Sequence, residues 1–203
     1  MFVSAEDRDL PANCGLRGHV TAHFGAQLVT ARAARVYVLY GSEYVPNEFR
    51  HGLGGDFTHH LTLYTAGGVF NHRYRELLDH DKTLNLKDKT PPSDERALEI
   101  SERSMKYLDQ AVAETVAWAA KHPKDAWTLS VIEPDEQGSW AARVRPGSYD
   151  VVVRGVISRL DAAWHYTYDI EPEKPVVLES QPHFFHPLTM PTSGEQQVKS
   201  NQF

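Results

Sequence analysis

Both ends of the chain carry apolar residues at alternate positions, the pattern that predicts β-strands. Within 15–40, a turn at 24–27 divides the pattern into two strands, and the second ends in a stretch that is apolar on both faces, as a central strand is. Further alternating runs follow from residue 127 onward, at 128–132, 140–144, 149–153, 164–170 and 175–178. Their short polar connections predict that these later strands form an antiparallel hairpin meander.

One of these connections has the chemistry of a specific turn. Pro146 and Gly147 stand between two of the predicted strands. Proline presets φ at the second position of a turn, and glycine accepts a positive φ at the third. The pair therefore predicts a type II turn.

The middle of the chain, roughly 41–126, has helical periodicity instead. Ser93 can cap a helix that runs to about Lys121, because Pro123 disfavours helical backbone at the preceding residue. Apolar residues cover about half of its circumference, more than one core requires. We expect this helix to contact two surfaces: the sheets together with a second helix of this chain, or else a partner subunit. The candidate interface stripe consists of Ile100, Tyr107, Ala111 and Trp118.

A second, shorter helix is predicted at 69–80, where Phe70, Tyr74 and Leu77 share one face. With strands at both ends and helices between them, the fold class is α+β. We expect one domain at 15–186 that carries a helical insertion at about 41–126. An N-terminal arm of 1–14 would precede it, and a polar C-terminal tail of 187–203 would follow.

Two motifs in the strands resemble those of a known family. Gly18-His-Val20, followed after a turn by Ala34-Arg-Val36-Tyr-Val38, resembles the opening of carboxypeptidase regulatory-like domains, also called transthyretin-like or prealbumin-like domains. The later Pro146-Gly147-Ser148-Tyr149 is similar to the Pro-Gly-x-Tyr hairpin that recurs in them. The resemblance implies an antiparallel, Greek-key-like β-sandwich, with the helical insertion between its second and third strands.

For function, the resemblance implies a binding or spacer module, often found in exported bacterial proteins. Two enzymatic relatives of this fold fit less well. Hydroxyisourate hydrolases end in Tyr-Arg-Gly-Ser, whereas this chain ends in Asn-Gln-Phe. Intradiol dioxygenases bind iron through two tyrosines and two histidines. Here only His165 follows the Pro-Gly turn, and Thr167 stands where the second histidine would be needed.

Composition narrows the functional classes. The formal charge of −6 argues against a general nucleic-acid binder, which would need a basic surface. A single cysteine, Cys14, excludes an intrachain disulfide. No apolar run approaches the length of a membrane span. The first ten residues lack the features of a signal peptide, which predicts a cytoplasmic protein, whereas the family resemblance points to an extracytoplasmic one.

Histidines in the predicted insertion form the candidate metal site. His72, Glu76 and His80 recur at every fourth position and so share one helix face, and His60 precedes them in the chain. Imidazole and carboxylate ligands suit zinc or iron. The alternative is an ordinary solvated face with no metal, and we expect no cofactor.

Aromatic residues on the later strands form the candidate ligand site. Trp140, Trp164, Tyr166 and Tyr168 could stack on a small molecule or a glycan, or they could belong to the core. Ser130, Ser139 and Ser148 lack the sequence motif of a nucleophilic serine.

The sequence therefore favours a non-catalytic binding or scaffolding module that works through its helical insertion and its aromatic strands. A protein partner or self-association is expected. One alternative is a metal-dependent enzyme that uses the insertion histidines. The other is an oligomeric structural protein with the long helix as its interface.

Overall fold

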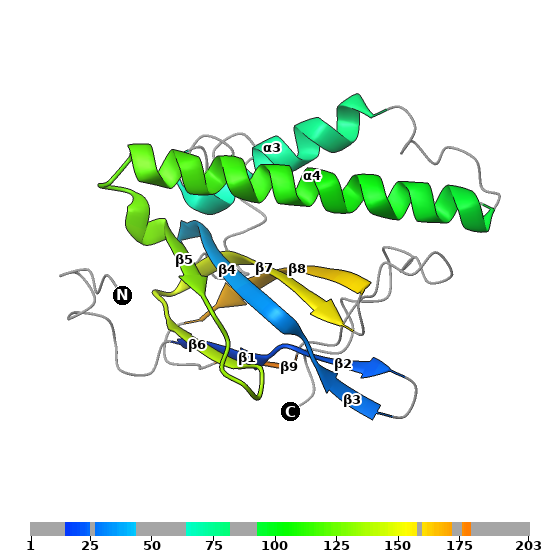
Figure 1. Ribbon diagram of the computed structural model, residues 1–203. Coiled ribbons are helices and arrows are strands. Elements are labelled where there is room, and N and C mark those ends of the chain that lie inside the picture. Colours follow the sequence, from blue (N-terminus) through cyan, green and yellow to red (C-terminus); the bar gives the residue numbers. More distant parts are fainter. Residues whose placement is uncertain are drawn as a thin grey trace.

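The computed structural model describes residues 15–24, 27–43, 64–81, 93–157, 160–171 and 176–179. They form an α+β fold in which two helices lie against one of two main sheets (Figure 1). The larger sheet is antiparallel and has the strand order β5 (Leu129–Ile132), β4 (Arg32–Glu43), β7 (Gly147–Ile157) and β8 (Leu160–Ile170). The smaller has the order β6 (Ser139–Arg143), β1 (Gly15–His19) and β9 (Val176–Glu179). A separate hairpin joins β2 (Thr21–Phe24) to β3 (Gln27–Thr30).

The two strands expected within 15–40 are each divided in two. Val20 separates β1 from β2, and Ala31 separates β3 from β4. These two residues bond to each other, because the Ala31 N–H donates to the Val20 carbonyl at 3.0 Å. The helices follow β4 in the chain and precede β5.

The predicted hairpin meander is wrong except for β7 and β8. Strand β5 pairs with β4, the next strand β6 pairs with β1 in the other sheet, and β7 returns to β4. Strand β9 does not pair with β8 but runs parallel to β1. Connection length predicts antiparallel pairing only when consecutive strands stay in one sheet, and here the chain repeatedly changes sheet.

The type II turn predicted at Pro146 and Gly147 is also wrong. Among the described glycines, only Gly138 has a positive φ, of 82°. Gly147 is the first residue of β7, and the lack of a side chain matters there for a different reason. A Cβ atom there would lie 2.6 Å from both the Ser42 carbonyl oxygen and the Tyr40 ring. The glycine therefore permits close packing of two strands.

Side chains from both main sheets share one hydrophobic core. Strand β7 contributes alternate residues from Tyr149 to Val153, strand β8 contributes Trp164, and the smaller sheet contributes Leu16 and Trp140. The intervening residues of β7 and β8 point to the opposite side of the larger sheet, as alternation requires. A core shared by two facing sheets is compatible with a β-sandwich.

The helices form a second layer on that opposite side (Figure 1). Helix α4 spans Asp94–Lys121 with Ser93 as its N-cap, which confirms the predicted long helix. Helix α3 spans Ala66–His80, three residues longer at its start than predicted. Their shared core with the sheet contains Leu39, Val152, Ala163, Phe70, Leu108, Ala111 and Val112. None of the described helices is both long enough and apolar enough to cross a membrane.

Polar contacts determine where α3 begins. Thr65 caps the helix by accepting the Gly68 N–H, and its hydroxyl donates to the Gly41 carbonyl on β4 at 2.9 Å. The Ala66 N–H donates to the Thr128 hydroxyl at 3.0 Å. The first turn of α3 is thus bonded both to β4 and to the 3-10 turn η3 (Ala126–Thr128).

Candidate functional site

A buried carboxylate lies between α3 and the larger sheet. Asp150, on β7, is only 3% exposed and accepts hydrogen bonds from three side chains. His165 Nε2 and Thr167 Oγ1, both on β8, donate to Oδ1 at 2.8 Å and 3.0 Å. Asn71 Nδ2, on α3, donates to Oδ2. A buried carboxylate is costly unless such donors surround it, so these four residues, the Asp150 cluster, act as one unit.

Aromatic rings of α3 flank the imidazole of this cluster. Phe70 and Tyr74 stack on each other with their ring centroids 5.6 Å apart. Both meet the His165 ring edge to face, at 5.1 Å and 6.0 Å. Burial raises the pKa of the Tyr74 hydroxyl. The imidazole is thus held by a carboxylate at Nε2 and by rings at its edges.

This arrangement has two chemical capabilities. A carboxylate on one imidazole nitrogen fixes the tautomer and leaves Nδ1 available as a base or as a metal ligand. The same hydrogen bonds also have a structural role, because the Asn71 bond attaches α3 to β7 and the His165 and Thr167 bonds join β8 to β7. The structural role uses all three of these hydrogen bonds to Asp150. The role as a base or metal ligand also needs a substrate or a metal beside Nδ1 of His165.

Sequence reasoning identified only part of this cluster. Alternation along the predicted strand at 164–170 puts His165 and Thr167 on one face, but sequence reasoning assigned no role to Asp150 or Asn71. The available signal is Asp150 itself, an acidic residue next to a run of three valines in a strand that is buried on both faces.

The predicted aromatic ligand site is mostly core. Trp140 and Trp164 are 6% and 1% exposed and pack between the two sheets. Tyr166 and Tyr168 are partly buried and pack against the same core, with their ring centroids 5.9 Å apart. These four residues therefore present no open row of aromatic faces.

Burial of the two tyrosines predicts a loss of stability at high pH. It raises the pKa of Tyr168 to about 12, and it raises the pKa of Tyr166 as well, with Tyr168 as a smaller cause. An unfolded tyrosine titrates near pH 10, at about its model value. The stabilisation is therefore complete below about pH 10 and is lost as the pH rises toward about 12, because the unfolded state releases its protons first.

Urea unfolding followed at several values between pH 9 and pH 12 measures this effect. Tyr168→Phe should make the pH dependence shallower, whereas Tyr64→Phe, at a side chain that is 75% exposed, should leave it unchanged. Equal slopes for the wild type and Tyr168→Phe would contradict the prediction.

The predicted metal residues occupy the exposed side of α3. His72 and His80 are exposed, and the carboxylate of Glu76 accepts a hydrogen bond from Arg73 at 2.7 Å. That bond is the main reason why the pKa of Glu76 is lowered. Among the described residues, no three potential ligands of the His, Cys, Asp or Glu type group together as a metal site. His60 lies outside the described residues.

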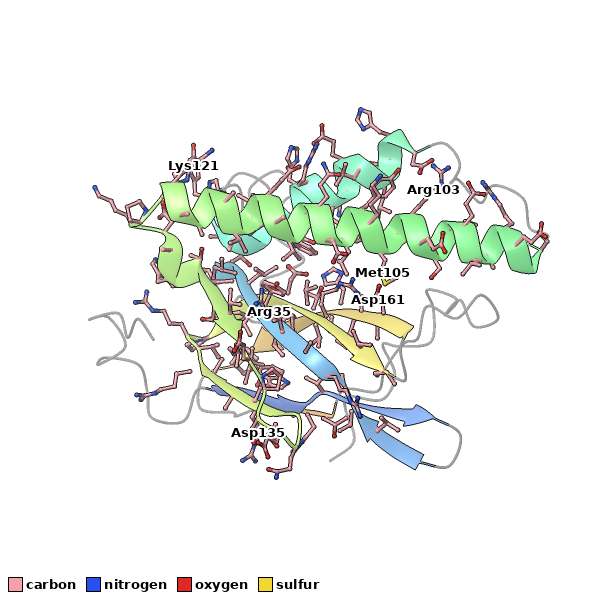
Figure 2. All side chains as sticks on the ribbon, in the orientation of Figure 1. Arg35, Arg103, Met105, Lys121, Asp135 and Asp161 are labelled. Atoms are coloured by element: carbon pink, nitrogen blue, oxygen red, sulfur yellow. The ribbon has the colours of Figure 1, made fainter. Side chains whose placement is uncertain are left out.

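The predicted interface stripe of α4 is largely occupied within the chain. Ile100 and Ala111 are buried, and Tyr107 donates its hydroxyl hydrogen to Asp81 at 2.6 Å. Trp118 is half-buried and stacks on His122. The two surfaces that α4 was expected to contact are thus the larger sheet and α3. Met105 lies on the sheet side, where its sulfur contacts Arg154 (Figure 2).

Comparison of the chain with known proteins finds no match. No family model matches it, no curated protein matches it, and no solved structure matches it.

Proposed function

We propose that this chain is a binding or scaffolding module that associates with a second copy of itself through the outer face of α4. Its supporting observation is a run of exposed apolar residues on the C-terminal half of that helix. Val116 is 38% exposed, and Ala113, Ala117 and Ala120 are exposed around it. Small side chains allow two helix backbones to approach closely.

Charges at the ends of this patch support an antiparallel pairing of two α4 helices. Asp109 precedes the patch by one turn and Lys121 follows it. Asp109 also pairs with Arg154 of β7, at 2.6 Å, so in an antiparallel pair centred on the patch each Lys121 would approach the edge of an ion pair that the partner already contains. The buried side of α4 already contacts the sheet and α3, so a partner would use this outer side alone. Sequence periodicity pointed to a different stripe, because it could not determine which apolar residues the chain covers itself.

Val116→Asp tests the proposal. We expect the wild type to form dimers in a concentration series by sedimentation velocity, and the variant to have a dimer Kd at least about tenfold higher, equivalent to about 1.4 kcal/mol. Leu98→Asp is the matched control. Leu98 is 45% exposed on the charged N-terminal half of the same helix, so this variant should dimerise normally. A wild type that stays monomeric throughout the series would overturn the proposal.

We further propose that the two sheets form a transthyretin-like, Greek-key-like sandwich in which residues 41–126 are a helical insertion. Two features support this proposal. The chain changes sheet between β5 and β6 and again between β6 and β7. The Pro146-Gly147-Ser148-Tyr149 motif stands at the start of β7, where Gly147 allows tight packing. Replacing residues 44–125 by a short linker tests it, with Leu39 and Val152, which the helices cover, changed to threonine. We expect a folded sandwich, and an unfolded chain would contradict the proposal.

A metal-dependent enzyme is the competing proposal, and the Asp150–His165 pair is the observation that favours it. Carboxylate-bonded histidines are common among zinc and iron ligands. Elemental mass spectrometry on protein purified without a chelator tests this alternative. It requires stoichiometric zinc or iron that His165→Ala removes. The binding-module proposal predicts metal contents that are equal, and far below one per chain, in both proteins.

A further inference from the structure

The smaller sheet carries a hydrogen-bonded serine and histidine on the side of the protein away from the helices (Figure 1). His19 ends β1 and Ser139 begins β6, and the two are register partners in the antiparallel ladder. Ser139 Oγ lies 3.0 Å from His19 Nδ1. His19 is exposed and Ser139 is half-buried, so the pair is accessible to solvent.

The backbone beneath Ser139 is firmly held. Asp135 accepts the Ser139 N–H at 2.7 Å and the Gln137 N–H at 3.0 Å through the same carboxylate oxygen. Gly138 takes its positive φ in this turn, and its carbonyl accepts the Val20 N–H at 2.8 Å. Figure 2 places Asp135 at this turn, beyond the strands and away from both helices. The turn therefore fixes the serine opposite the histidine.

Residues with charged side chains stand at neighbouring positions of β1 and β9. Arg17 is exposed on the same face of β1, two residues before His19 and thus about 7 Å along the strand. It forms no ion pair among the described residues. On the other side of β1, the parallel register places Glu179 of β9 next to His19. A hydroxyl, an imidazole and a guanidinium thus occupy one face.

We propose that Ser139 is a nucleophilic serine that His19 activates, and that it accepts acyl groups from activated esters or thioesters. When the imidazole carries its proton on Nε2, Nδ1 accepts the hydroxyl hydrogen of the serine. The serine oxygen forms a bond to the acyl carbon as its proton moves to Nδ1. The carbon–oxygen or carbon–sulfur bond to the leaving group then breaks, and the alcohol or thiol departs with the proton. Arg17 provides positive charge for the oxyanion that forms in between.

This activity is separate from the proposed dimerisation, because the pair and the outer face of α4 belong to different layers. It also differs from the metal alternative, because the proposed step needs only an activated acyl donor.

The test is reaction with p-nitrophenyl acetate, followed by intact mass spectrometry and peptide mapping. We expect one acetyl group on Ser139, and its absence in Ser139→Ala. His19→Gln should slow the acylation on the order of a hundredfold, which is a usual contribution of a general base. Arg17→Gln should slow it by a smaller factor. Ser130→Ala, at a half-buried serine on β5, is the matched control and should react like the wild type.

Three results would overturn the proposal: no acetylation of the wild type, acetylation mapped only to lysines, or equal acylation rates in the wild type and His19→Gln. Circular dichroism spectra of the variants exclude loss of folding as the cause of a negative result. Release of acetate after acylation would support the proposal too, since it still requires Ser139 as the acceptor.

Discussion

Asp150→Ala is expected to lower the free energy of unfolding by about 2–4 kcal/mol, because it removes three side-chain hydrogen bonds that each contribute about 0.5–1.5 kcal/mol. The variant leaves His165, Thr167 and Asn71 without the acceptor that all three share. Two of these donors are on β8 and the third is on α3, so the loss should weaken the attachment of α3 to the sheet. Chemical denaturation at neutral pH measures the change.

Two further variants separate the Asp150 cluster from a general effect of removing an acidic residue. Asp161→Ala, at an exposed position on β8, should change stability by no more than about 0.5 kcal/mol. In a double-mutant cycle, Asp150→Ala and His165→Ala should show an interaction energy between about 0.5 and 3 kcal/mol, because each change removes the same hydrogen bond. Additive effects would contradict the view that the cluster acts as one unit.

Gly67→Ala is expected to destabilise the protein by about 1–3 kcal/mol, although alanine is the better helix former by about 1 kcal/mol. The first turn of α3 packs directly on the backbone of β4. A Cβ atom at residue 67 would lie 2.8 Å from the Gly41 Cα and 2.9 Å from both the Gly41 nitrogen and the Tyr40 carbonyl carbon. These atoms belong to the backbone of a central strand and cannot move aside easily.

Hydrogen exchange should locate the effect of Gly67→Ala. Amides of α3 should lose protection, while those of β7 and β8 should keep most of theirs. Gly15→Ala serves as the control, because its Cβ would meet its nearest neighbour, the Ala142 carbonyl oxygen, at an ordinary 3.4 Å. A Gly67→Ala protein that is more stable than the wild type would show that helix propensity outweighs the close approach.

The limits of α4 could be predicted from the sequence because they depend on local chemistry. Ser93 accepts the Arg96 N–H at the start of the helix, and Pro123 lies two residues after its end. Most strands could be predicted for a similar reason, since alternation is a property of neighbouring residues. Their pairing could not be predicted. The parallel contact of β9 with β1 joins residues more than 150 positions apart, and no local signal encodes it.

For the candidate functional residues, too, the sequence determines which residues share a face, and the tertiary structure determines what they contact. The sequence by itself determined that His72, Glu76 and His80 share a helix face, and that His165 and Thr167 share a strand face. Only the tertiary structure decided that Trp164 is buried, that Val116 is exposed, and that Asp150 lies beneath Asn71. The contact of His19 with Ser139 spans 120 positions of the chain. Periodicity shows which residues point the same way along one element, whereas burial and side-chain contacts depend on which other element packs there.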